Sequence, residues 1–189
     1  MSDLIHRVNV GDSLTRTAAA RPEKIAVVDG GRRLTYAELD DWVNRIAHGL
    51  DHAGWQRGDA LGLASGNSAE FLAVYYACAK LGLVCVPINL GWRADEVAYV
   101  LGHSRAKGLA VETQLVAAMG DALRKATGVT EVILLPGLHA EYATEPADRL
   151  WVTLADREAE DTYTPTAEVA DRDPLTYLYT SGTTSFPKG

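Results

Sequence analysis

The feature that most constrains the fold of this sequence is a regular alternation of strand and helix patterns between residues 60 and 135. Short apolar runs predict strands, and longer runs with apolar residues at helical spacing separate them. The strands are predicted at 60–64, 83–86, 108–111 and 131–135, and the helices at 69–80, 94–102 and 113–126. Strands separated by helices pair in parallel through right-handed crossovers. The sequence therefore predicts an α/β fold with layered, largely parallel sheets and flanking helices.

A helix and a hairpin are predicted ahead of this alternation. The helix covers residues 13–20, and the hairpin strands cover 25–28 and 32–34. Gly30 and Gly31 join the two strands, because adjacent glycines suit the tight turn of a hairpin.

Two helix starts carry capping signals. Thr35 precedes one helix, and Glu38 stands three residues later, which is the spacing of a capping box. Asn67 and Glu70 have the same spacing before the helix at 69–80. Thr35 and Asn67 are therefore predicted as N-caps.

The excess charge of the chain lies in one segment. The formal net charge is −7, and residues 137–173 alone hold ten acidic and three basic side chains. The rest of the chain is balanced and offers no basic surface for nucleic acid or anionic lipid. The apolar run at 150–154 inside the segment is predicted to dock as a strand or short turn. The segment is interpreted as a bridge between two sheet layers.

Other bulk features exclude several kinds of site. No run of about 18 apolar residues is present and the first seven residues lack a signal-peptide pattern, so no transmembrane helix and a cytoplasmic location are expected. Cys78 and Cys85 lie among apolar neighbours and are predicted as buried free thiols. The histidines show neither catalytic-triad nor metal spacing and are expected on helix faces or at the surface: His6, His48, His52, His103 and His139.

The last fourteen residues carry the strongest chemical signal. An apolar run at 175–179 is predicted as a strand, and it ends in small hydroxyl residues, glycine and a lysine. Gly182 allows backbone N–H groups to approach a phosphate, and Lys188 supplies a mobile positive charge. Four side chains can donate hydroxyl hydrogen bonds: Ser181, Thr183, Thr184 and Ser185. The pattern predicts a strand followed by a loop that binds a nucleoside triphosphate.

The sequence of this loop allows two other interpretations. The Walker A pattern is G-x-x-x-x-G-K-[ST], and Gly182 and Lys188 have its spacing. Pro187 stands at the second glycine and has no N–H to donate, and Gly189 replaces the hydroxyl residue that holds magnesium. A P-loop phosphotransferase is therefore disfavoured. The remaining alternative is an ordinary polar surface loop, because Ser, Thr and Gly are common turn residues.

The same stretch resembles the signature [YF]-T-S-G-[ST]-T-G-x-P-K-G of the adenylate-forming superfamily, which includes acyl-CoA synthetases, luciferases and peptide-synthetase adenylation domains. Residues 179–184 and 187–189 match this signature, and Ser185 stands where it has glycine. At a positive φ, serine costs about 1 kcal/mol more than glycine, so weaker or differently shaped nucleotide binding is expected.

Further segments resemble the opening of an acyl-CoA synthetase in the same order. They include residues 21–28, 34–39 and 86–89, so the resemblance runs from about Ser13 to Gly189. It favours fatty-acyl or aryl-CoA ligases and implies the incomplete amino-terminal part of an adenylate-forming enzyme fold. Three parts are expected: an α/β subdomain at 1–136, an acidic connection at 137–173, and a strand with the phosphate-binding loop at 174–189.

The resemblance also implies a reaction. ATP and a carboxylic acid would give an acyl-adenylate and pyrophosphate, and coenzyme A would then displace AMP. ATP, Mg and CoA are thus the implied cofactors, with Lys188 neutralising the β and γ phosphates and Thr184 helping to bind magnesium. The implied phosphate-binding residues are Thr180, Ser181, Gly182, Thr183, Thr184, Ser185, Pro187, Lys188 and Gly189.

No catalytic residue is assigned within this chain. In the family, the adenine and ribose contacts, the acyl pocket, the magnesium-binding glutamate and the lysine of the mobile carboxy-terminal domain follow the position of Gly189. The isolated 189 residues are therefore expected to be inactive. Two protein partners are expected: the rest of the enzyme as a separate chain, or a second copy of the same chain in a homodimer. The alternative function is a non-catalytic assembly unit paired with a complementary chain.

Overall fold

The computed structural model describes residues 9–136, 149–180 and 186–189. The chain divides into two compact units, each assembled from separated stretches of sequence. Unit 1 comprises Met1–Gly58, Asn67–Leu83 and Arg157–Leu175, and unit 2 comprises Asp59–Gly66, Val84–Asp156 and Thr176–Gly189. The three parts expected from the sequence, with boundaries at 136 and 173, remain a prediction.

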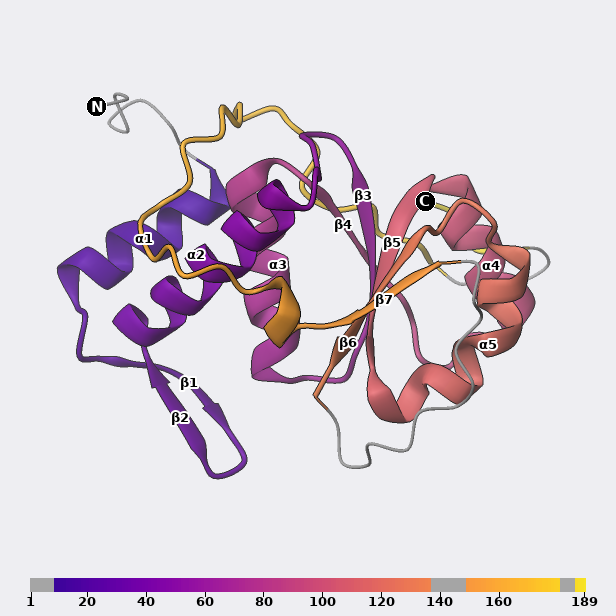
Figure 1. Cartoon of the computed structure of the whole chain (residues 1–189), viewed down its shortest axis with the longest axis horizontal. Helices are drawn as coiled ribbons and strands as arrows, with labels where there is room; N and C mark the ends of the chain where they lie inside the picture. The colour runs from indigo at the N-terminus through magenta and orange to yellow at the C-terminus, as the bar shows by residue number, and fades with distance from the viewer. Residues whose placement is uncertain (1–8, 137–148, 181–185) are drawn as a thin grey trace. The chain divides into compact units, whose positions relative to one another are not determined.

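Unit 2 is built on a five-stranded sheet with the order β4-β3-β5-β6-β7 (Figure 1). Every neighbouring pair in it runs parallel. The predicted parallel α/β architecture is therefore confirmed, and the apolar run after residue 149 is a strand. The strands are β3 (Ala60–Ala64), β4 (Val84–Pro87), β5 (Ala106–Glu112), β6 (Glu131–Leu135) and β7 (Leu150–Thr153).

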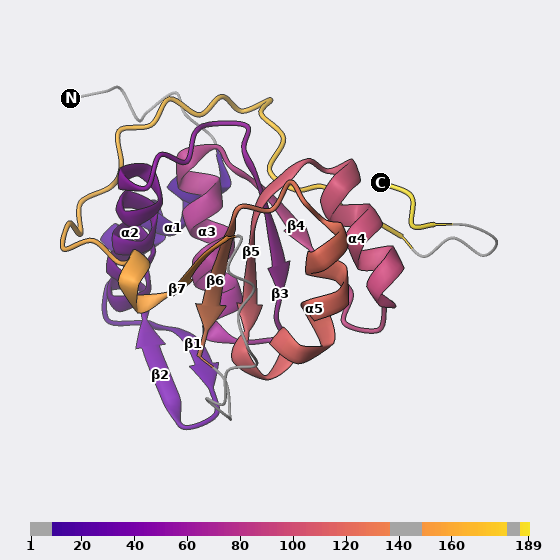
Figure 2. The same ribbon diagram turned by 45° about the vertical axis from the view of Figure 1, so that its right-hand side comes forward.

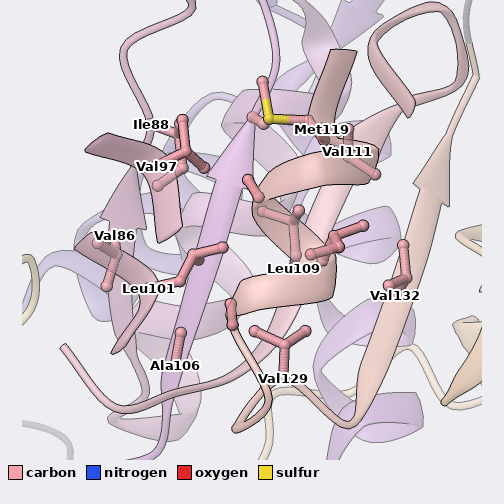
Figure 3. Close-up of a cluster of buried hydrophobic side chains, with 14 of the residues drawn as sticks. Val86, Ile88, Val97, Leu101, Ala106, Leu109, Val111, Met119, Val129 and Val132 are labelled. Carbon is pink, nitrogen blue, oxygen red and sulfur yellow. The ribbon is translucent and has the colours of Figure 1, made fainter. Parts of the chain in front are cut away.

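Two helices of unit 2, α4 (Ala94–His103) and α5 (Val116–Lys125), lie on the same face of this sheet (Figure 2). Leu101 of α4 and Met119 of α5 meet Leu109 and Val111 of β5 in an aliphatic core (Figure 3). Burying such side chains stabilises the folded state by about 1.5–3 kcal/mol each. The core fixes the position of α4, which matters for the site described below.

Gly62 in β3 allows the close approach of α4 to the sheet. A Cβ atom at this position would lie 2.7 Å from Cδ2 of Leu101 and 3.0 Å from Cδ1 of Leu109. No side chain larger than hydrogen fits without moving both leucines, so the small residue sets the distance between helix and strand.

The described residues of unit 1 form three helices and an antiparallel hairpin (Figure 1). The helices are α1 (Val10–Ala20), α2 (Tyr36–His52) and α3 (Ala69–Leu81). The hairpin pairs β1 (Ile25–Asp29) with β2 (Arg32–Thr35), as the sequence predicts. Gly30 at the turn has a φ of 56°, a conformation that glycine adopts without strain.

The capping box of α2 is confirmed, whereas the one predicted for α3 is wrong. The amide N–H of Glu38 donates to Oγ1 of Thr35, and the Glu38 carboxylate accepts from the Thr35 amide. For α3 the N-cap is Ser68, whose Oγ accepts from the amide of Phe71. Glu70 is drawn instead to Arg32 of the hairpin, whose Nη2 lies 2.7 Å from its Oε1. A charged partner from another element thus overrides the local pattern.

Two other helix starts differ from the sequence pattern. α1 begins at Val10 and not at residue 13, because Oδ1 of Asn9 accepts a hydrogen bond from the amide of Asp12 at 2.8 Å. The predicted helix at 113–126 begins as a 3₁₀ turn, η1 (Thr113–Leu115), before α5. Both differences lie at element ends, where local capping decides the boundary.

The acidic segment beyond β7 includes a second 3₁₀ turn, η2 (Ala155–Arg157), and then follows α2 of unit 1. Glu158 accepts hydrogen bonds from Nε1 of Trp42 and Nε of Arg45. The side chain of Asn44 donates to the carbonyl of Thr162 at 2.6 Å. These bonds hold an extended chain that lacks regular structure, and residues 137–148 lie outside the described part.

Both cysteines, Cys78 and Cys85, are buried and free, as predicted. Among the described residues, no helix combines the length and the apolar character needed to span a bilayer.

Candidate phosphate-binding site

The predicted phosphate-binding residues fall into a described and an undescribed set. The described residues are Thr180, Pro187, Lys188 and Gly189. The predicted residues outside the described part are Ser181, Gly182, Thr183, Thr184 and Ser185. The predicted magnesium ligand, Thr184, is therefore among those whose geometry is not described.

The strand predicted at 175–179 is wrong in extent. The segment makes one isolated parallel bridge, between Thr176 and Cys85 of β4, in which the amide of Tyr177 donates to the Cys85 carbonyl at 3.1 Å. In a longer parallel ladder, the next hydrogen bond would run from the backbone N–H of residue 87 to the carbonyl oxygen of Tyr177. Pro87 has no N–H, so the ladder stops after one bridge.

The two ends of the loop are joined to each other. The amide of Thr180 donates to the carbonyl of Lys188 at 2.8 Å, and the amide of Lys188 donates to the carbonyl of Thr180 at 3.0 Å. This antiparallel bridge closes a loop of seven residues, 181–187, whose ends are fixed at one point. A stretch whose two ends are joined in this way is a candidate for binding an anion.

Lys188 supplies positive charge at this closed end. Its side chain is exposed, and within the described ranges it forms no ion pair. Lys188 also lines an open hollow of about 520 Å³ together with Tyr99, His103, Phe186, Pro187 and Gly189. The Lys188 side chain is therefore exposed, and its role in binding a phosphate stays a prediction.

Two residues that contact the loop were missed by sequence reasoning. Nδ1 of His103 lies 2.7 Å from the hydroxyl of Tyr179, and their rings meet edge to face at 5.7 Å between centroids. Tyr99 stacks on Phe186 at 4.9 Å between centroids. His103 lies on a helix surface as expected. Tyr99 and His103 are four residues apart, which places both rings on one helix face. This spacing is the one feature of the sequence that could have indicated their shared contact with the loop.

Partial burial raises the pKa of the Tyr179 phenol above its ordinary value, and the nearby phenols of Tyr99 and Tyr177 add to this effect. The hydroxyl therefore keeps its proton across the neutral range. When the His103 proton is on Nε2, the Tyr179 hydroxyl donates to Nδ1.

Metal-binding side chains are not gathered anywhere in the described part of the chain. No group of three or more His, Cys, Asp or Glu residues there has the arrangement to hold a metal ion.

The parallel sheet and the lysine-bearing loop closed by the bridge between Thr180 and Lys188 define an α/β protein with a candidate anion-binding loop. Comparison with known families is more specific: the sequence model of "AMP-binding enzyme" matches residues 14–189. The chain belongs to this family, and the adenylate-forming resemblance is confirmed.

Curated relatives are acyl-CoA ligases. The long-chain-fatty-acid–CoA ligase FadD13 of Mycobacterium tuberculosis is 35% identical over 185 residues, which cover 96% of this chain and 34% of that protein. A medium/long-chain-fatty-acid–CoA/3-oxocholest-4-en-26-oate–CoA ligase of Mycobacterium marinum is 27% identical over 183 residues, covering 96% of this chain and 33% of the relative. The chain thus spans about a third of the length of these relatives.

Solved structures agree with the fold. The inhibitor-bound N-terminal domain of FACL13 from Mycobacterium tuberculosis is 34% identical with a TM-score of 0.75, covering 96% of this chain and 43% of that one. The anthranilate CoA ligase AuaEII, bound to anthranoyl-AMP, has a TM-score of 0.81 at 23% identity, covering 98% of this chain and 35% of that one. The second likeness concerns the fold alone.

Proposed function

We propose that this chain is the amino-terminal part of an ATP-dependent carboxylic acid–CoA ligase that acts on fatty acids. The observation that carries the proposal is the bridge between Thr180 and Lys188, which closes the signature loop and leaves the lysine side chain exposed beside it. The fatty-acid assignment is supported by the named activity of the relative FadD13.

The proposed role of the loop follows from where charge develops. A carboxylate oxygen attacks the α-phosphorus of ATP, the bond to the bridging oxygen breaks, and pyrophosphate leaves with the extra negative charge. Lys188 and the hydroxyl and amide donors of residues 180–185 would bind the β and γ phosphates. Donors fixed in advance at the site of developing charge lower the barrier, typically by a few kcal/mol each.

ATP, Mg²⁺ and CoA are the proposed cofactors and substrates. Mg²⁺ would neutralise phosphate charge when bound, with Thr184 as the proposed protein ligand. A hydroxyl next to phosphate oxygens fits the preference of this ion for oxygen donors. The alternative of a non-catalytic assembly unit is not favoured, because the curated relatives matched over 96% of this chain are named ligases.

The proposal is tested by ATP–pyrophosphate exchange with a panel of fatty and aryl acids. The protein assayed is the complete product of the gene, because the 189 residues alone are expected to be inactive. Acid-dependent exchange is expected, with a preference for fatty acids. Lys188→Met is expected to lower the exchange rate by about 100-fold or more, because it removes a cation from the developing charge. Lys188→Arg keeps the charge and is expected to lose less.

A matched control removes a lysine outside the loop. Lys24 is exposed in unit 1, and Lys24→Met is expected to leave the exchange rate unchanged. An equal loss in Lys24→Met and Lys188→Met would contradict the phosphate-binding role. Absence of acid-dependent exchange in the unmodified protein would contradict the ligase proposal itself.

A further inference from the structure

One helix, α4, contacts both legs of the phosphate loop, whose legs we define as residues 179–180 and 186–189. His103 holds the first leg through the hydroxyl of Tyr179, and Tyr99 holds the second through the ring of Phe186. The rings of Tyr99 and His103 stack on each other at 5.4 Å between centroids. The two contacts therefore form one continuous aromatic cluster on a single helix face.

α4 is a fixed platform for these contacts. Its opposite face buries Val97, Val100 and Leu101 in the core of unit 2. At its end, the hydroxyl of Ser104 donates to the carbonyl of Val100 at 2.7 Å in a buried position. A helix held this way has little freedom, so the rings on its exposed face have a defined position.

The two legs also pack directly on each other. A Cβ atom at Gly189 would lie 2.7 Å from the ring of Tyr179, which is closer than any side chain allows. The backbone of Gly189 therefore lies in close contact with the ring of Tyr179. Fixing Tyr179 consequently fixes Gly189 and, through the bridge with Thr180, the neighbouring Lys188.

We infer that Tyr99 and His103 are positioning residues of the phosphate loop, which hold its two legs and thereby place Lys188 for the polyphosphate of a bound nucleotide. The inference rests on the proposed function and adds two residues outside the signature to it. Neither residue touches the reacting atoms in this assignment; both act through Tyr179 and Phe186.

The exposure of Tyr99 and Phe186 separates their contact from ordinary core packing, whereas Tyr179 is half-buried and packs against the core. Tyr99 is 36% exposed and Phe186 is 52% exposed. Contacts between exposed rings bury little apolar area and so contribute little to the free energy of unfolding. Their effect is instead on the position of the loop relative to α4, which a stability measurement does not report.

The kinetic test uses His103→Leu and His103→Asn in the gene product. His103→Leu removes the partner of the Tyr179 hydroxyl, and the KM for ATP in pyrophosphate exchange is expected to rise about three- to tenfold, as for one lost hydrogen bond. The KM for the acid is expected to stay unchanged. His103→Asn places a polar group near the position of Nδ1 and is expected to restore most of the ATP affinity.

A second measurement does not depend on activity. Hydrogen–deuterium exchange of the Thr180 and Lys188 amides reports the bridge between the legs, and both amides are expected to exchange faster in His103→Leu and Tyr99→Ala. Unchanged amide exchange in both variants would overturn the inference, as would an equal rise in the KM values for ATP and acid. If the wild-type protein showed no acid-dependent pyrophosphate exchange, only the ligase proposal would be refuted. The hydrogen–deuterium measurement on the Thr180 and Lys188 amides would still decide whether α4 positions the loop.

Discussion

The ammonium nitrogen of Lys80 lies 2.6 Å from Oδ1 of Asp40 in the interior of unit 1. The same nitrogen donates to Oδ1 of Asn44 at 2.5 Å and to Oγ1 of Thr15 at 2.9 Å. Its three protons are therefore all used, and one side chain of α3 joins α1 to α2. Lys80 is only 3% exposed and Asp40 8%, so the pair has given up most of its hydration.

Breaking this pair on one side is expected to destabilise unit 1. Lys80→Met leaves the Asp40 carboxylate buried without a cation, and the free energy of unfolding is expected to fall by about 3–5 kcal/mol. Lys80→Met with Asp40→Leu removes both charges, and most of that loss is expected to be recovered. Urea unfolding of the three proteins measures the difference. A double variant no more stable than the single one would show that the ion pair is not the cause.

The same lysine predicts a dependence of stability on pH. Desolvation lowers the pKa of Lys80 from its ordinary value of 10.5, although the Asp40 carboxylate partly opposes this effect. Between the folded-state pKa and 10.5, the unfolded chain binds more protons than the folded chain. The contribution of Lys80 to the free energy of unfolding therefore rises with pH in this alkaline window. The free energy of unfolding is measured as a function of pH across this window for wild type and Lys80→Met. If it changed with pH by the same amount in both proteins, the expectation would be contradicted.

The fold was largely predictable from the sequence because its signals are local and repeated. β3 is a run of small and apolar residues and β6 is apolar after Glu131, and both have the predicted bounds. The capping box of Thr35 and Glu38 marks the start of α2. The errors arise where a residue interacts with a partner far away in the sequence. Glu70 forms an ion pair with Arg32 and not the predicted capping box. The segment after residue 174 forms only one bridge to β4, because Pro87 has no N–H for the next hydrogen bond.

The candidate site was predictable only in part, for the same reason. The hydroxyl, glycine and lysine pattern lies within fourteen consecutive residues and is visible in the sequence. Tyr99 and His103 precede Tyr179 by 80 and 76 positions, and only the packing of α4 on the sheet brings them to the loop. Lys80, similarly, looks like the polar end of an apolar helix until α1 and α2 surround it.

The capping box of α2 gives a prediction with a close control. Thr35→Ala removes the acceptor of the Glu38 amide, and a loss of about 1 kcal/mol in the free energy of unfolding is expected. Thr35→Ser keeps the hydroxyl and is expected to lose little. Thermal and urea unfolding measure both variants. Equal losses in the two variants would assign the effect to the methyl group and not to the cap.

Gly49 in α2 is expected to be needed for the docking of the segment that follows η2. A Cβ atom at Gly49 would overlap the backbone carbonyl of Arg157, and backbone cannot swing aside as a flexible side chain can. Gly49→Ala therefore has to move the segment, which breaks the hydrogen bond from the Ala159 amide to the Arg45 carbonyl. Such overpacking costs about 1–3 kcal/mol, more than the gain in helix propensity of about 1 kcal/mol from replacing glycine with alanine.

Gly102→Ala is the matched control for this prediction. Gly102 is also a helical glycine, but a Cβ there would meet nothing within 4 Å. This variant is expected to be unchanged or more stable by up to about 1 kcal/mol, whereas Gly49→Ala is expected to be less stable. Hydrogen–deuterium exchange of the Ala159 amide locates the effect, since only Gly49→Ala should speed it. If Gly49→Ala kept both the stability and the Ala159 protection of wild type, the segment would have room that the structure does not show.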